Sequence, residues 1–128
     1  MTEQETKLNN VTNNIKDFLS KEINKIQEEQ ENNINIATTI INQLPKGWRY
    51  MTGTKIIMAI KNGLAFRPGT NPEAISHIEI RLNSMDLYDV TTYKGKGLKM
   101  TKKETISGLY FDMLQKTLEQ KTKLYFSL

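Results

Sequence analysis

The chain has 128 residues, of which 38% are hydrophobic, and it contains no cysteine. This length suits one domain, and the lack of cysteine excludes disulfides and thiolate metal sites. The net charge of +4 is unevenly divided: residues 1–45 carry four lysines against seven acidic residues (−3), and residues 46–128 carry fourteen basic against seven acidic residues (+7). Opposite signs predict different partners for the two parts, or a contact between them.

Residues 4–44 have the periodicity of a helix. In the first part apolar residues recur every three or four positions, which predicts one narrow stripe on a polar helix. The stripe consists of Leu8, Val11, Ile15, Phe18, Leu19, Ile23 and Ile26. It must pack on its own domain, on a partner, or on a second copy as a short coiled coil. The polar run 27–33 leaves open whether the helix continues or breaks before apolar residues resume and Pro45 ends it.

Two hairpins are expected next. Residues 55–60 and 64–67 flank Asn62-Gly63, a pair typical of a type I′ turn with positive φ at both positions. Residues 77–82 alternate apolar and polar side chains, residues 83–86 have turn chemistry, and residues 87–93 return as a strand.

The remaining residues predict a last strand and a helix. Residues 94–103 hold five lysines, two glycines and no acid, which indicates a mobile connection before a strand over residues 99–106. We expect Ser107 or Gly108 to open a helix to about Lys121, with one apolar side formed by Tyr110, Leu114, Leu118 and Tyr125. Residues 124–128 should dock on the sheet. The predicted fold is α+β: a helical arm over residues 1–45, then a domain over residues 46–128 with four to five antiparallel strands and a C-terminal helix.

The sequence contains no catalytic or cofactor constellation. His77 is the only histidine, and its alternation with Ile78 predicts a solvent-facing strand position. Asp86 and Asp89 resemble a carboxylate pair for Mg²⁺ or acid–base work, but their place at a turn favours turn-forming roles. The glycines near residue 96 do not form a phosphate-binding G-x-x-x-x-G-K-[ST] loop. We therefore expect no enzyme, no cofactor and no metal.

Basic residues supply the clearest functional signal. They suit contact with a nucleic-acid backbone or an acidic partner, while Trp48 and three tyrosines suit stacking on unpaired bases. The basic candidates are Lys94, Lys96, Lys99, Lys102, Lys103, Arg49, Arg67 and Arg81. A lysine-rich connection also keeps a sheet edge from aggregating, and the sequence leaves both interpretations open.

Several segments carry a resemblance to a known family. They are Met51-Thr-Gly-Thr-Lys-Ile-Ile57, Asn62-Gly-Leu-Ala-Phe-Arg67, Ile78-Glu-Ile-Arg-Leu-Asn-Ser-Met-Asp-Leu-Tyr-Asp-Val90, Gly108-Leu-Tyr-Phe-Asp-Met-Leu-Gln115 and Lys123-Leu-Tyr-Phe-Ser-Leu128. In order and spacing, over about residues 36–128, they resemble a family of small proteins carried by phages and integrated mobile elements, frequent in Bacteroidetes. The resemblance implies a setting and transfers no catalytic residue.

From this setting we hypothesise an anti-defence protein of the anti-CRISPR kind, which inhibits a host RNA-guided nuclease by binding the effector or its guide RNA. The helical stripe would dock on the effector, and the lysines would contact phosphate or an acidic surface. The alternatives are a nucleic-acid-binding accessory protein of element replication or packaging, and a homodimer formed through the N-terminal helix. Because the chain has no signal peptide and no apolar run of membrane-spanning length, we expect it in the cytoplasm of a bacterial host.

Overall fold

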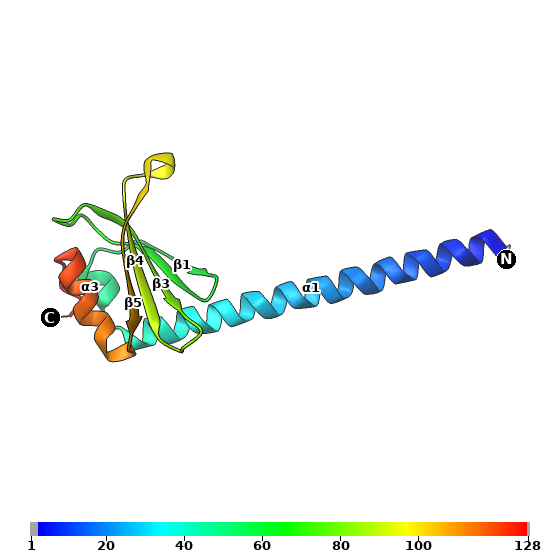
Figure 1. Ribbon diagram of the computed structural model, residues 1–128, viewed down its shortest axis with the longest axis horizontal. Helices are drawn as coiled ribbons and strands as arrows, with labels where there is room; N and C mark the ends of the chain where they lie inside the picture. Colours follow the sequence, from blue (N-terminus) through cyan, green and yellow to red (C-terminus); the bar gives the residue numbers. More distant parts are fainter. Residues whose placement is uncertain (1–2, 128) are drawn as a thin grey trace. The chain divides into compact units, whose positions relative to one another are not determined.

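The computed structural model describes residues 3–127, without the side chains of residues 3–6 and 8. The helices and strands follow in the order α1 (Glu3–Gln43), α2 (Trp48–Met51), β1 (Ile56–Ile60), β2 (Gly63–Arg67), β3 (Ile75–Leu82), β4 (Tyr88–Lys94), η1 (Gly97–Lys99), β5 (Thr101–Leu109), η2 (Phe111–Met113) and α3 (Leu114–Thr122) (Figure 1). The strands form one antiparallel sheet with the spatial order β1-β2-β3-β4-β5. The predicted α+β fold, with a long N-terminal helix and a C-terminal helix, is confirmed.

The chain divides into two compact units, Met1–Asn32 and Asn33–Leu128. The boundary was expected after residue 45, whereas this division falls inside α1. The helix passes through the polar run 27–33 without a break (Figure 1). This run contains good helix formers and neither Pro nor Gly, so nothing in it ends a helix. No helix among residues 3–127 is long and apolar enough to span a membrane.

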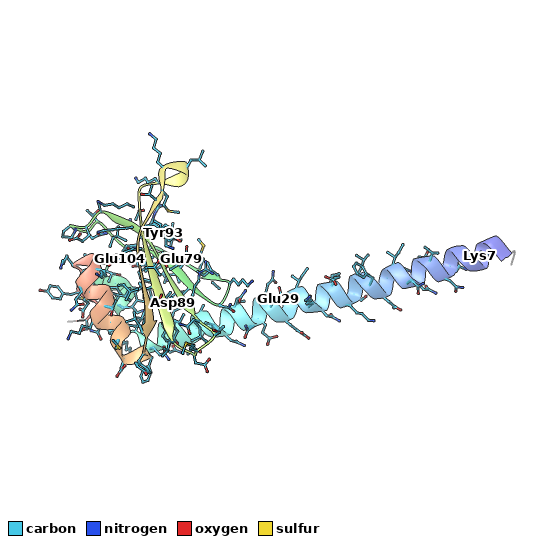
Figure 2. The ribbon with its side chains drawn as sticks, viewed as in Figure 1. Lys7, Glu29, Glu79, Asp89, Tyr93 and Glu104 are labelled. Carbon is cyan, nitrogen blue, oxygen red and sulfur yellow. The ribbon has the colours of Figure 1, made fainter. Side chains whose placement is uncertain are left out.

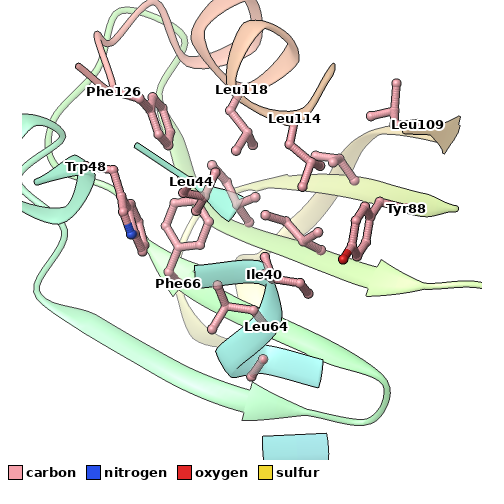
Figure 3. Packing of buried hydrophobic residues seen from close by; sticks show 14 of the residues in the cluster. Ile40, Leu44, Trp48, Leu64, Phe66, Tyr88, Leu109, Leu114, Leu118 and Phe126 are labelled. Atoms are coloured by element: carbon pink, nitrogen blue, oxygen red, sulfur yellow. The ribbon is translucent and has the colours of Figure 1, made fainter. Parts of the chain in front are cut away.

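The core of the second unit lies on one face of the sheet. The alternation in β3 and β4 turns Ile78, Ile80 and Val90 toward this face, where all three are fully buried. Ile40 of α1 and Leu118 of α3 are also fully buried in the same cluster (Figure 3). Helices from both ends of the chain therefore cover a single sheet face, as an antiparallel sheet with one packed side requires.

Three aromatic rings close one end of this core. Trp48 of α2 meets Phe66 edge-on, with ring centroids 5.0 Å apart, and stacks parallel to Phe126 at 6.1 Å (Figure 3). Phe126 is fully buried, so the expected docking of the C-terminal segment is confirmed at this residue, whereas Leu128 lies outside the described residues. Burial of these large rings makes this end a main contributor to the stability of the second unit.

Gly63 serves a purpose other than the predicted one. The loop that joins β1 to β2 consists of Lys61 and Asn62, because Gly63 already pairs with Ile60. Asn62 has a positive φ (58°) but Gly63 does not, so the predicted type I′ turn at Asn62-Gly63 was wrong. A Cβ atom on Gly63 would clash with the carbonyl oxygen of Ile80 on β3. Glycine is therefore required here because two strands approach closely.

The last strand is longer, and the last helix begins later, than expected. The ladder between β4 and β5 continues to the pair Tyr88 and Leu109, so the predicted helix start at Ser107 or Gly108 was wrong. The N–H of Gly108 donates to the carboxylate of Asp89 on β4 (3.1 Å), which holds this residue in the sheet. Sheet pairing overrides the local helical pattern here.

The predicted apolar side of the C-terminal helix is only half correct. Leu114 and Leu118 are buried, as expected, but Tyr110 precedes the helix and is exposed. Lys123 ends α3 in a left-handed conformation (φ 60°), which shifts the following residues off the helical spacing. Phe126 consequently enters the core, and Tyr125 points to solvent.

Candidate interaction surfaces

The predicted apolar stripe on α1 is exposed. Six large apolar side chains each expose between 50% and 62% of their surface: Val11, Ile15, Phe18, Leu19, Ile23 and Ile26. The side chain of Leu8 lies outside those that the structure describes. A row of apolar side chains three and four positions apart covers one side of a helix, and few monomers leave such a row uncovered.

An acidic stretch follows the stripe along the helix. Glu28, Glu29 and Glu31 come within two turns of Ile26, and all three are exposed; Glu29 is labelled in Figure 2. The apolar stripe together with this acidic end suits a partner surface that is apolar at its centre and basic at one side.

The basic segment forms the end of the β4–β5 hairpin. In Figure 1 this loop, drawn in yellow, extends beyond the other strands of the sheet. Gly95 has a φ of 88°, and a Cβ atom on it would lie 2.5 Å from the carbonyl oxygen of Lys99, so the tight loop needs glycine there. We call residues 94–103 the basic hairpin; its five lysines, Lys94, Lys96, Lys99, Lys102 and Lys103, are all exposed. Leu98 at its end is fully exposed, which adds an apolar contact to the positive charges.

Arg67 lies beside the base of the basic hairpin. Together with Lys96 it lines a depression of about 380 Å³, whose other walls come from the loop between β2 and β3 and from the start of β3. Gly69 in that loop donates its N–H to the carbonyl of Thr52 (2.9 Å), and a Cβ on it would lie 2.7 Å from the same oxygen. The structure thus brings Arg67 to the basic hairpin at a concave surface large enough for a phosphate group.

Lys103 differs from the other lysines of the basic hairpin because it forms an ion pair with an acidic side chain. Its Nζ lies 3.1 Å from the carboxylate of Glu73. The hydrogen bond and the charge of Lys103 hold the pKa of Glu73 below its usual value of 4.5. Lys103 is therefore less available to an external phosphate than Lys96 or Lys99.

Trp48 and Arg49 have structural roles. Trp48 is 4% exposed and packed between Phe66 and Phe126, so its predicted stacking on bases is corrected to a core role. Arg49 donates to the carbonyls of Thr54 (3.3 Å) and Lys55 (3.0 Å), which ties α2 to the start of β1. Sequence spacing could not show this, since Trp48 and Phe126 are far apart in the chain.

The face of the sheet opposite the core carries a charged network whose members are not recognisable as a group from the sequence. The Nε of Arg81 donates to the carboxylate of Glu79 (3.0 Å), and His77 Nε2 lies 3.8 Å from the same group. The ring of Tyr93 on β4 lies against His77, with centroids 5.4 Å apart. Alternation places His77, Glu79 and Arg81 on one face, and pairing of β3 with β4 adds Tyr93. Arg81 is thus part of this network, apart from the basic hairpin.

Burial and hydrogen bonding oppose each other at Glu79. Partial burial acts to raise the pKa of this carboxyl, but hydrogen bonds from Arg81 and Tyr93 outweigh it and leave the pKa below 4.5. Burial raises the pKa of Tyr93 above its usual value of 10.0, and the bond to Glu79 adds to this. The network therefore keeps Glu79 ionised and Tyr93 protonated near neutral pH.

Asp86 and Asp89 have structural roles: Asp86 lies in the turn between β3 and β4, and Asp89 on β4 accepts hydrogen bonds from neighbouring segments. Asp86 adopts a positive φ (58°) and donates its N–H to the carbonyl of Asn83 (3.1 Å). Asp89 accepts from the side chain of Asn83 (3.0 Å) and from the N–H of Gly108. Within the described part of the chain, no group of three or more His, Asp or Glu residues is placed to hold a metal ion.

Comparison with family models, with curated proteins and with solved structures found no match to this chain.

Proposed function

We propose that this chain is an anti-defence protein of the anti-CRISPR kind, which binds a host RNA-guided nuclease or its guide RNA and blocks it without chemical turnover. The observation that carries the proposal is the exposed stripe on α1. Large apolar side chains anchor protein interfaces when a partner covers them, and this stripe supplies six in one row.

Charge supports a nuclease as the partner. RNA-guided nucleases hold their heteroduplex in a positively charged channel, so they expose basic surface near their functional sites. The acidic residues Glu28, Glu29 and Glu31 beside the stripe complement such a surface. The basic hairpin carries the opposite charge and suits the guide RNA backbone. The resemblance to small mobile-element proteins supplies the biological setting.

The test is a DNA-cleavage assay with purified, guide-loaded nucleases from Bacteroidetes hosts, run against increasing amounts of the full chain. We expect inhibition that saturates near a stoichiometric ratio. The double variant Ile15→Asp and Ile26→Asp should weaken inhibition by at least tenfold, because it places charge in the apolar contact.

A matched control carries the same two charges on the polar side of the same helix, as Asn13→Asp and Asn24→Asp. This control should inhibit like the wild type. If the wild type inhibits none of the nucleases and co-purifies with none, the anti-CRISPR proposal is wrong.

The basic hairpin favours a second function, a nucleic-acid-binding accessory protein of element replication or packaging. Direct contact with phosphates weakens as salt rises, with a log–log slope of about 0.7 to 0.9 for each phosphate neutralised. In a salt titration with single-stranded RNA, replacing Lys94, Lys96, Lys99 and Lys102 by Glu should abolish binding, and Lys116→Glu on α3 serves as a control. Bulk nucleic-acid binding without nuclease inhibition would favour this function.

The stripe also fits a second copy of the chain. In sedimentation experiments, a homodimer that dissociates with Ile15→Asp and Ile26→Asp but not with the Asn13 and Asn24 control would assign the stripe to self-association. A monomer at the concentrations that inhibit the nuclease would assign it to the partner.

A further inference from the structure

Strand β1 is an uncovered apolar edge of the sheet. It lies at the end of the strand order and has β2 as its neighbour. Its five residues, Ile56-Ile-Met-Ala-Ile60, are all apolar, and their pairing with β2 has no bulge. Ile56 and Met58 expose 46% and 49% of their surface. Proteins usually protect such an edge with charges, proline or a bulge within the strand, and β1 has none of these.

The hydrogen-bond pattern shows which groups face outward. The N–H of Leu82 donates to the carbonyl of Asn62 (2.8 Å), so the neighbouring pair of Gly63 and Arg81 is a non-hydrogen-bonded pair. Gly63 therefore directs its own N–H and C=O toward Ile60 on β1. Because hydrogen-bonded pairs alternate along an antiparallel ladder, the backbone groups of Ile57 and Ala59 point away from β2. Outside the β1–β2 ladder, no hydrogen bond described for residues 3–127 involves the backbone of Ile57 or Ala59.

Positively charged side chains lie at both ends of strand β1. Lys55 comes directly before β1, and its carbonyl accepts a hydrogen bond from Arg49. Arg67 on β2 adds a further positive charge at this end, since it pairs with Ile56. At the other end lies Lys61, whose carbonyl accepts from Arg81 (2.7 Å). Arg81 is neutralised in part by Glu79, but Lys55 and Lys61 are both exposed. A strand added here would gain from acidic residues near its two ends.

A depression lies on the outer face beside β1. Its volume is about 160 Å³, and its lining includes Ile56, Met58 and Met100, with Arg67 and His77. Methionine side chains adapt to different shapes, so this depression suits one apolar side chain of an added strand.

We propose that β1 is a docking edge for an extended segment of a partner protein, apolar in its middle and acidic at both ends. Four backbone groups, on Ile57 and Ala59, would pair with this segment and extend the sheet by one strand. Neither the stripe on α1 nor the lysines of the basic hairpin take part in this docking, so the inference does not depend on the proposed function.

Charge argues against a second copy as the occupant. An antiparallel pair of β1 strands that uses all four outward groups has its two-fold axis at Met58. This register sets Lys55 of each copy directly opposite Lys61 of the other, twice over. Like charges directly opposite each other destabilise a strand pair, whereas an acid-ended segment has the reverse effect.

The test is selection of a displayed library of random nine-residue peptides on the full chain, in parallel with Ala59→Pro and Ala59→Ser. Proline removes the outward N–H of residue 59, and this is the side of an edge strand where proline is tolerated. Serine keeps that N–H and serves as the matched control. The near-ultraviolet signal of Trp48, the only tryptophan, verifies the core in each variant.

We expect the wild type and Ala59→Ser to enrich peptides with alternating apolar residues and Asp or Glu near both ends. Ala59→Pro should bind a selected peptide at least about tenfold more weakly, from the lost hydrogen bond and the bulk of the ring. The double variant Lys55→Glu and Lys61→Glu should weaken it about threefold and favour a lysine-ended version.

Three outcomes would overturn the proposal. One is a peptide selection that enriches no sequence pattern on the wild type, or that enriches the same pattern on Ala59→Pro as on the wild type. Another is a preference for basic peptide ends. The third is a homodimer that Ala59→Pro dissociates, which would assign the edge to a second copy.

Discussion

Two apolar stretches of the same helix differ in burial: the first is exposed and the second is packed in the core. Both follow the three-and-four spacing, yet Ile15 of the stripe is 53% exposed and Ile40, nearer the end of α1, is fully buried. Pro45 and Gly47 turn the chain after the second stretch, so that α2 and the sheet can pack against it. The comparison teaches that periodicity reveals an apolar helix face, whereas burial depends on what the rest of the chain brings to it.

Truncating one residue in each stretch should give the largest contrast. Ile40→Ala removes fully packed atoms and leaves a cavity, so we expect the free energy of unfolding to fall by about 4 kcal/mol. Ile15→Ala should change it by no more than about 0.5 kcal/mol, because its side chain is half exposed. Urea unfolding followed by Trp48 fluorescence measures both. Equal losses would mean that the stripe packs on its own domain.

A proline in each stretch should separate the two units. Thr39→Pro breaks α1 where it contributes to the core, and we expect a loss of about 3 kcal/mol in the unfolding of the second unit. Gln30→Pro breaks the helix within the first unit, Met1–Asn32, and should leave that value almost unchanged. It should lower only the helical signal in far-ultraviolet circular dichroism. A large loss with Gln30→Pro would show that the two units fold as one.

Acid should lower the stability of the sheet that covers the second stretch, by less than either the truncation or the proline at that stretch. The pKa of Glu79 is lowered in the folded chain, so its contribution to stability is present above about pH 4.5 and is lost as the pH falls through the folded pKa. The urea midpoint should therefore fall on acidification, and less steeply in Glu79→Gln. Glu73→Gln is the control; its carboxyl is also shifted, but solvent screens its ion pair with Lys103. An identical pH profile in all three proteins would contradict a role for the outer network.

Much of the fold was predictable because it follows from local patterns. Alternation in residues 77–82 and the turn residues at 83–86 identified the central hairpin, in which the side-chain oxygen of Asn83 accepts from the N–H groups of Met85 (2.8 Å) and Leu87 (3.2 Å). The start of the C-terminal helix was misplaced because Leu109 pairs with Tyr88 on β4 and the N–H of Gly108 donates to Asp89, both contacts between distant residues. Local patterns carry no information about such pairing.

The candidate surfaces were predictable only in part. The lysines of the basic hairpin are adjacent in sequence, so their clustering needed no tertiary information. Arg67 joins them through folding, whereas Arg49 and Arg81 bond to the carbonyls at the two ends of β1. Trp48 could not be recognised as a core residue, because its partners Phe66 and Phe126 come from distant segments.

The sequence by itself determined the α+β class, the stripe on α1, the basic hairpin and the split of charge between the two parts of the chain. These features depend on periodicity, turn chemistry and composition, which are properties of residues close together in the sequence. Only the tertiary structure decided that the stripe stays uncovered while Ile40 is buried, that Trp48 lies in the core, and that β1 is an open edge between two lysines. Burial and strand order depend on which distant segments meet, because packing and hydrogen bonding across a sheet are settled by the whole fold.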